Sequence, residues 1–147
     1  MKGVIEISER HLVANVAALR EAVGPDYEIL GVIKADAYGH GATLCAPVLQ
    51  AAGLRWLGVG DVEEGRRVRE VLRRAEEGFG ENQHARMTNL VVMCGFEPAE
   101  ASEIVAARLT PVIWIAEHVE ALERAVARQA TGGPGACLLY TSPSPRD

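Results

Sequence analysis

The chain has 147 residues, of which 48% are hydrophobic and 24% charged, and its formal net charge is -5. This length and composition are ordinary for one soluble globular domain with a core of its own. The acidic balance provides no basic surface for nucleic acid. No apolar run reaches the roughly 20 residues of a transmembrane helix, and no secretory leader pattern opens the chain. We therefore expect a cytoplasmic protein.

Strand-like and helix-like segments alternate along the chain. Apolar, β-branched runs predict strands over 4–7, 29–34, 55–60, 90–96 and 109–115. Helical spacing of apolar residues predicts helices after Ser8, after Gly41, from Asp61, after Pro98 and over 117–129. Asp61 and Glu64 have the spacing of a capping box. Residues 73–89 break the rhythm, and we expect a surface excursion there.

This alternation indicates an α/β protein with a parallel sheet covered by helices. The sheet is either doubly wound or closed as a (β/α)8 barrel, and periodicity alone does not distinguish the two. A dinucleotide fingerprint needs a third glycine after Gly39 and Gly41, or after Gly58 and Gly60. Those positions are Leu44 and Glu63, which weakens the doubly wound alternative.

Neither the cysteines nor the histidines have the spacing of a metal site or a disulfide framework. Three cysteines are widely separated: Cys45, Cys94 and Cys137. Three of the four histidines are equally scattered: His11, His84 and His118. We expect reduced thiols, structural or surface histidines, and no metal. The Gly-x-Ser-x-Gly pattern of a serine hydrolase is absent.

The most informative stretch is 29–41, Ile-Leu-Gly-Val-Ile-Lys-Ala-Asp-Ala-Tyr-Gly-His-Gly, in which an apolar strand ends on Lys34 before a glycine-flanked turn. Side chains alternate along a strand, so Leu30, Val32 and Lys34 share one face. A lone lysine at a strand end is usually a solvated charge. The residues around this lysine give it a more specific interpretation.

Residues 32–41, Val-Ile-Lys-Ala-Asp-Ala-Tyr-Gly-His-Gly, resemble the pyridoxal-phosphate attachment motif of bacterial alanine racemases. The resemblance continues through 56–59, 63–65 and 109–114, and it departs from the family at the long 73–89 excursion. It implies that residues 1–135 form the first half of a (β/α)8 TIM-type barrel, about four βα units. It also implies a β-rich second domain, a homodimer, and interconversion of L- and D-alanine for peptidoglycan.

The resemblance also implies roles for individual residues. Lys34 would form a Schiff base with pyridoxal 5'-phosphate and, once released, act as a base on one face of the substrate. A slot lined by Leu30 and Val32 would favour its neutral amine by desolvation. Tyr38 matches the tyrosine that holds the cofactor phosphate. The acid-base group for the opposite face would be a tyrosine of the partner subunit's second domain, outside this chain.

Other polar and aromatic residues near the motif have structural interpretations. Asp36 and His40, short polar residues in a glycine turn, are expected to fix backbone geometry through hydrogen bonds. Glu63 and Glu64 are adjacent on a helix and therefore point in different directions, which is unsuitable for a carboxylate dyad. Trp56 and Trp114 are expected to be packing residues.

Residues 136–147 do not continue a strand-helix unit and resemble translated sequencing-adapter sequence. We expect them to be non-native and the chain to be a truncated fragment that is inactive alone. Two further alternatives stay open: a racemase for another amino acid, and a pyridoxal-phosphate-binding homeostasis protein without turnover.

Overall fold

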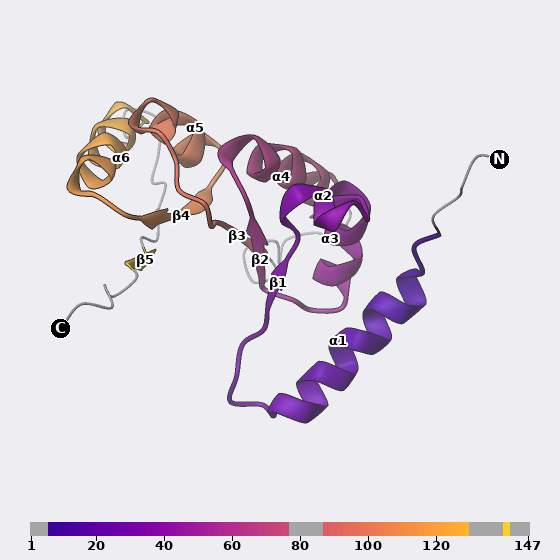
Figure 1. The fold of residues 1–147 in the computed structure, drawn as a ribbon. Helices are drawn as coiled ribbons and strands as arrows, with labels where there is room; N and C mark the ends of the chain where they lie inside the picture. The colour runs from indigo at the N-terminus through magenta and orange to yellow at the C-terminus, as the bar shows by residue number, and fades with distance from the viewer. Residues whose placement is uncertain (1–5, 77–86, 130–139, 142–147) are drawn as a thin grey trace.

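A computed structural model describes residues 6–76, 87–129 and 140–141. The strands and helices predicted between residues 8 and 129 follow one another in the predicted order, whereas the sequence predicts neither the short helix over 34–38 nor the strand over 140–141 (Figure 1). The elements are α1 (Glu9–Val23), β1 (Leu30–Val32), α2 (Lys34–Tyr38), α3 (Ala42–Ala51), β2 (Trp56–Val59), α4 (Val62–Glu76), β3 (Asn89–Val92), the 3-10 helix η2 (Pro98–Glu100), α5 (Ala101–Ala106), β4 (Leu109–Ile113), α6 (Ala116–Gln129) and β5 (Tyr140–Thr141).

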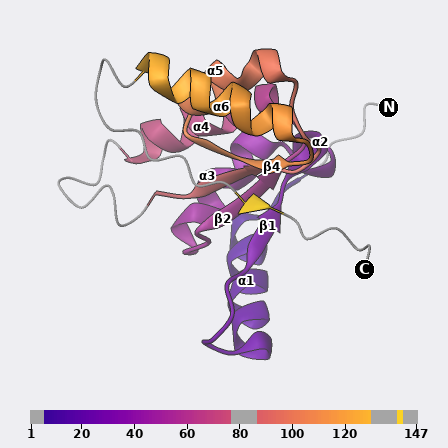
Figure 2. The same cartoon turned by 90° about the vertical axis from the view of Figure 1, so that its left-hand side faces the viewer.

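The described strands form one parallel sheet in the order β1-β2-β3-β4-β5. In register, Leu57 of β2 lies between Gly31 and Leu90, and Leu90 pairs with Leu109. Each crossover therefore moves to the next neighbour in the same direction. Because parallel crossovers are almost always right-handed, this order places the helices on one face of the sheet (Figure 2). A doubly wound sheet reverses direction, so the order is that of a barrel.

The core lies between the sheet and the helices that cover it. Leu57 and Val59 of β2, Leu90 of β3, Leu72 of α4 and Ile104 of α5 have no exposed surface. Burial of this apolar area is the main favourable contribution to the fold. On the opposite face of β1, Leu30 is 40% exposed and Val32 is 36% exposed. The sheet is thus covered on one face and open on the other, as half of a barrel would be.

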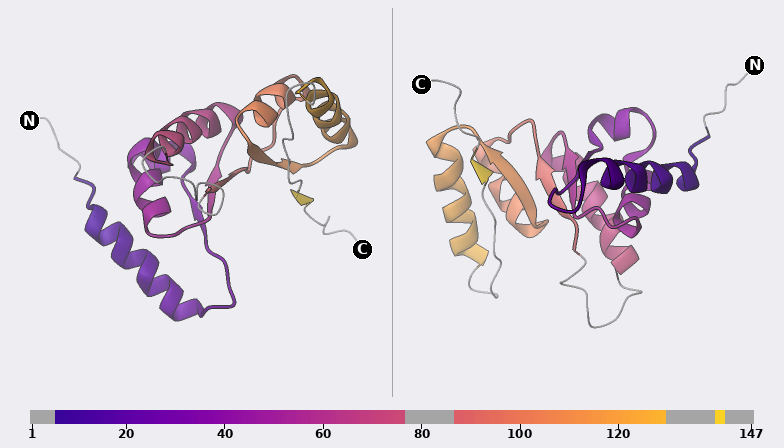
Figure 3. Two further views of the ribbon diagram at one scale, coloured as in Figure 1. Left: turned by 180° about the vertical axis from the view of Figure 1, so that it is seen from behind. Right: turned by 90° about the horizontal axis from the view of Figure 1, so that it is seen from below.

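Helix α1 begins and ends where its sequence signals predict. The Ser8 hydroxyl accepts a hydrogen bond from the His11 amide at 3.4 Å, and Gly24 ends the helix with a φ of 84°. Of the predicted apolar stripe only Val16 is buried, while Leu19 remains 52% exposed. Figure 3 shows α1 at one end of the molecule and α6 at the other.

The prediction of a surface excursion over residues 73–89 is partly wrong. Helix α4 continues to Glu76, supported by ion pairs from Glu70 to Arg73 at 3.2 Å and to Arg74 at 2.9 Å. Residues 77–86 of the excursion lie outside the described residues. Half of the strand predicted over 4–7 also lies outside them, and its other two residues, Glu6 and Ile7, belong to no element.

One aromatic expectation at the end of β4 also needs correction. Trp114 is 63% exposed, so it is not a packing residue of the core. His118 is buried, and its ring lies 4.3 Å from that of Phe96, centroid to centroid. Its Nδ1 accepts a hydrogen bond from the Trp114 amide at 3.4 Å. His118 is therefore a structural residue of the core, one of the two roles expected for the histidines.

Cys45 is buried and Cys94 exposed, and neither forms a disulfide; Cys137 lies outside the described residues. Over the described ranges no three His, Cys, Asp or Glu side chains gather as a metal site. None of the described helices combines the length and the apolar character needed to cross a membrane. Of the tail expected to be non-native, only Tyr140–Thr141 are described, and they pair with β4.

Candidate active site

The carboxyl ends of the parallel strands meet at one edge of the sheet, and Lys34 lies there. Backbone hydrogen bonds continue the sheet beyond the strands, from the Ile33 amide to the Gly58 carbonyl at 2.8 Å and from the Cys94 amide to the Gly60 carbonyl at 3.0 Å. Gly60 lies beside the lysine, because a Cβ built on this glycine would be 3.6 Å from Lys34 Cβ. The predicted position of Lys34 at this edge is thus confirmed.

The Lys34 side chain is half-buried, and its amine has no hydrogen bond or ion pair to any described residue. The predicted apolar slot is not closed around it, since Leu30 and Val32 are both more than a third exposed. The reason is the open inner face of the sheet, which no described strand or helix covers. The amine is therefore accessible from that face.

Directly after Lys34 the backbone makes a left-handed turn that the sequence does not predict. Ala35, Asp36, Ala37 and Tyr38 have φ values of 51°, 53°, 53° and 55°. A left-handed helical conformation costs L-residues roughly 1–2 kcal/mol each, because Cβ approaches the following carbonyl oxygen. Four such residues in succession need compensating interactions from their surroundings.

Part of that compensation comes from Asp36 and His40. Asp36 Oδ1 accepts a hydrogen bond from the Ala42 amide at 2.7 Å, and the Asp36 carbonyl accepts one from the Gly41 amide at 2.9 Å. His40 Nδ1 lies 2.7 Å from the Ala37 carbonyl oxygen. The Asp36 carboxylate thereby joins the turn to the start of α3. These contacts match the expectation that both residues fix backbone geometry.

Glu64 supplies further contacts from the neighbouring unit. Its Oε1 accepts a hydrogen bond from the Asp36 amide at 3.1 Å, and its Oε2 accepts one from the Gly60 amide at 2.8 Å. The Glu64 amide donates to Asp61 Oδ1 at 2.8 Å, so Asp61 caps α4 as predicted. The Glu64 carboxylate instead contacts Gly60 and the distant turn. Sequence spacing missed this contact, because Asp36 lies 28 residues earlier in the chain.

Cys45 of α3 packs beneath the turn. Its side chain is only 4% exposed, and Sγ donates a weak hydrogen bond to the His40 carbonyl at 3.7 Å. Burial, and to a lesser extent the negative charge of Asp36, raise the pKa of the Cys45 thiol above its ordinary value of 9.0. This thiol is therefore a protonated packing group near the site rather than a nucleophile.

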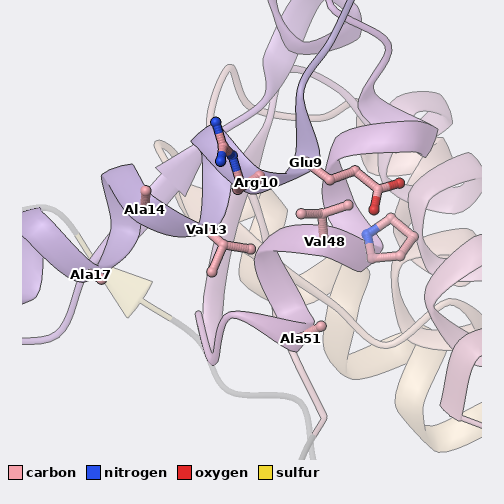
Figure 4. Close-up of a pocket in the computed structure, with 8 residues that line it drawn as sticks. Glu9, Arg10, Val13, Ala14, Ala17, Val48 and Ala51 are labelled. Atoms are coloured by element: carbon pink, nitrogen blue, oxygen red, sulfur yellow. The ribbon is translucent and has the colours of Figure 1, made fainter.

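Tyr38, the last residue of the turn, is 61% exposed, and its hydroxyl has no hydrogen-bond partner within the described part of the chain. A separate groove lies between α1 and α3 (Figure 4). Its lining is Glu9, Arg10, Val13, Ala14, Ala17, Pro47, Val48 and Ala51. Because neither Lys34 nor Tyr38 lines it, this groove is distinct from the lysine site.

A parallel sheet in barrel order, with a lysine where its strands end, defines part of a (β/α)8 barrel. The chain belongs to the alanine racemase family, since residues 7–139 match the family described as alanine racemase, N-terminal domain.

Individual relatives agree with this assignment. An alanine racemase from Streptomyces coelicolor is 38% identical over 130 residues, which are 85% of this chain and 30% of the relative. A crystal structure of alanine racemase from Bartonella henselae with covalently bound pyridoxal phosphate has a TM-score of 0.65 and 27% identity, and the match covers 84% of this chain and 32% of that one. The chain thus spans about a third of the length of these relatives.

A histidine racemase from Leuconostoc mesenteroides subsp. sake is equally similar in structure. Its TM-score is 0.65 with 25% identity, and the match covers 88% of this chain and 30% of the histidine racemase. Racemases named for different amino acids therefore share the fold of this chain.

Proposed function

We propose that this chain is the part of an alanine racemase that attaches pyridoxal phosphate through Lys34, and that the whole homodimeric protein interconverts L- and D-alanine for peptidoglycan. The observation that carries the proposal is the Lys34 amine, which has no hydrogen bond or ion pair to a described residue, at the carboxyl edge of a barrel-type sheet in a member of this family. The sequence feature that supports it most specifically is the motif over residues 32–41, which resembles the pyridoxal-phosphate attachment motif of alanine racemases.

The residues at this edge fit the cofactor. The missing side chain at Gly60 leaves space beside Lys34, where a Cβ would come within 3.1 Å of Glu64 Oε2. Tyr38, four residues after the lysine, offers an exposed hydroxyl that can donate to a phosphate oxygen. When bound, pyridoxal phosphate supplies an aldehyde that bonds to an amine and a ring that accepts electrons from the substrate Cα.

Two roles follow for Lys34. As a neutral amine it is the nucleophile that holds the cofactor, and after substrate exchange it removes or returns the Cα proton on one face. Racemisation requires a second acid-base group on the opposite face. By the resemblance to the family, we assign that group to a tyrosine of the partner subunit's second domain.

Covalent trapping tests the assignment. The sequence has two lysines, Lys2 and Lys34, so each gives a distinct peptide. The chain is incubated with pyridoxal phosphate, reduced with borohydride, digested and mapped by mass spectrometry. We expect label on the Lys34 peptide well in excess of the Lys2 peptide. Label that is not enriched at Lys34 overturns the proposal.

Two variants sharpen this experiment. Lys34→Ala should abolish the enriched label and leave the Lys2 label unchanged. Tyr38→Phe should keep the site of labelling and raise the pyridoxal phosphate concentration needed by about ten-fold, the value of one hydrogen bond to a charged group. Equal loss with pyridoxal, which has no phosphate, would show that Tyr38 does not contact the phosphate.

The similarity to a histidine racemase favours a second candidate, a racemase for another amino acid. Solvent-deuterium exchange at Cα separates the two candidates, because it requires proton removal on one face only. The rates for alanine, serine and histidine in the pyridoxal-phosphate-loaded protein rank the substrates directly, and alanine is expected to be fastest.

A further inference from the structure

We propose that Glu64 is a positioning residue for Lys34, acting through the left-handed turn that follows the lysine. The inference rests on the proposed role of Lys34 as the attachment residue. It concerns how the lysine is aimed, which neither the family match nor the motif describes.

The contacts of Glu64 join two βα units at one point. Its two carboxylate oxygens accept hydrogen bonds from the Asp36 amide of the turn at 3.1 Å and from the Gly60 amide at the end of β2 at 2.8 Å. The Glu64 backbone is itself held by Asp61 Oδ1 at 2.8 Å. Hydrogen bonds from amides to a carboxylate are stronger than those between neutral groups. The carboxylate therefore fixes the distance between the turn and the second strand.

Lys34 lies between two such attachments. The Ile33 amide, just before it, donates to the Gly58 carbonyl of β2 at 2.8 Å, and the Asp36 amide, two residues after it, donates to Glu64. The lysine backbone is thus tied to the β2 unit on both sides. Since Cβ follows the backbone, these attachments set the direction in which the amine leaves the sheet.

The strain of the turn gives Glu64 a specific task. Ala35, Asp36 and Ala37 would otherwise favour right-handed or extended backbone, yet all three have φ values between 51° and 53°. The Asp36 amide is the group of this strained segment that Glu64 holds. Without that acceptor the turn can relax, and the amine then samples other directions.

Gly60 belongs to the same arrangement. A Cβ on this residue would lie 3.1 Å from Glu64 Oε2 and 3.6 Å from Lys34 Cβ. The carboxylate and the lysine therefore lie on either side of Gly60, where a side chain would press against the carboxylate.

The adjacent Glu63 provides a matched control. It is the same residue type on the same helix turn, but its carboxylate is 62% exposed and pairs with Arg66 at 3.0 Å. Glu63→Ala removes an equal charge from α4 without touching the turn. Exposed ion pairs of this kind contribute little to stability.

The test measures the ratio of Lys34 label to Lys2 label after pyridoxal phosphate and borohydride, together with the absorbance band of the unreduced adduct. Glu64→Ala is expected to lower the ratio at least five-fold and to weaken the band. Glu64→Gln keeps the side-chain length and one acceptor oxygen, so its labelling ratio should lie between those of the unchanged chain and Glu64→Ala. Glu63→Ala should match the unchanged chain.

The outcomes separate this inference from the proposed function. Unchanged protein without enrichment at Lys34 overturns the proposed function, and the present inference with it. Enrichment that persists within two-fold in Glu64→Ala overturns the positioning role alone. An equal loss in Glu63→Ala and Glu64→Ala also overturns it, because the effect would then come from charge or helix stability.

Hydrogen-deuterium exchange provides a readout without the cofactor. Peptides containing Asp36 and Gly60 should exchange several-fold faster in Glu64→Ala, while peptides from β3 and α5 keep their protection. Unchanged exchange at Asp36 and Gly60 contradicts the proposed contacts. Loss of protection throughout the chain would mean that Glu64 supports the fold as a whole, which also contradicts the inference.

Discussion

Cys45 links the chemistry of the turn to the stability of the fold. Its thiol has a raised pKa, first because it is buried and second because Asp36 is nearby. The folded state therefore holds this proton more tightly than the unfolded chain, whose thiol titrates near 9.0. Below that value the stabilisation is fully present, and it is lost as pH rises from the unfolded value through the folded one.

We predict that the free energy of unfolding falls with rising pH above 9.0 more steeply in the unchanged chain than in Cys45→Ala. The difference in slope is at most about 1.4 kcal/mol per pH unit, the value for one proton. Urea unfolding at a series of pH values measures it. Cys94→Ala, at an exposed cysteine, is the control, and identical slopes for Cys45→Ala and the unchanged chain would contradict the prediction.

Single residues near Lys34 also show where sequence reasoning ends. Asp61 as a helix cap and Asp36 as a turn residue follow from local rules, because both hydrogen-bond within a few residues of their own position. The contact from Glu64 to Asp36 does not, because local rules cannot see a partner in another strand-helix unit. The left-handed turn was missed for the same reason, since alanine and aspartate favour it only when distant groups hold it.

Between elements, Arg20 joins α1 to α3. Its guanidinium donates to the Ala52 carbonyl at 2.9 Å and to the Gly53 carbonyl at 2.6 Å, where α3 leaves carbonyls without helical partners. We predict that Arg20→Ala makes α1 amides exchange about five-fold faster, since two exposed charged hydrogen bonds contribute about 1 kcal/mol together. Hydrogen-deuterium exchange of α1 peptides measures this. Arg10→Ala, in the same helix, should leave α1 unchanged, and equal effects of both variants would argue against the cap.

The order of β1 to β4 was predictable because these strands are largely apolar and bounded by turn formers, whereas β5 falls in a tail for which the sequence predicts no strand. The residues at which the strands end were less predictable. β1 stops at Val32, and β3 stops at Val92 rather than continuing to Phe96. The sequence predicts the end of α4 too early, because a charged run is typical of a loop, whereas Glu70 pairs with arginines one turn later. Charge runs at helical spacing support a helix as readily as they end one.

At the scale of the whole molecule, the order of the strands distinguishes a barrel from a doubly wound sheet, which the periodicity of the sequence could not do. Strands that add in sequence at one edge, with helices on one face, lead toward closure into a barrel. The described sheet has an open inner face instead, with Leu30 40% and Val32 36% exposed. Apolar surface of this kind is normally covered by further structure.

This arrangement leads to the last prediction, which concerns activity. The 147-residue chain alone should label at Lys34 yet show no racemase turnover with L- or D-alanine. One acid-base group can exchange a proton on a single face of Cα, whereas inversion needs a second group on the other face. Polarimetry or a D-amino-acid oxidase assay measures turnover, with deuterium exchange at Cα as the companion readout. Measurable inversion by this chain, abolished by Lys34→Ala, would show that the second group lies within it.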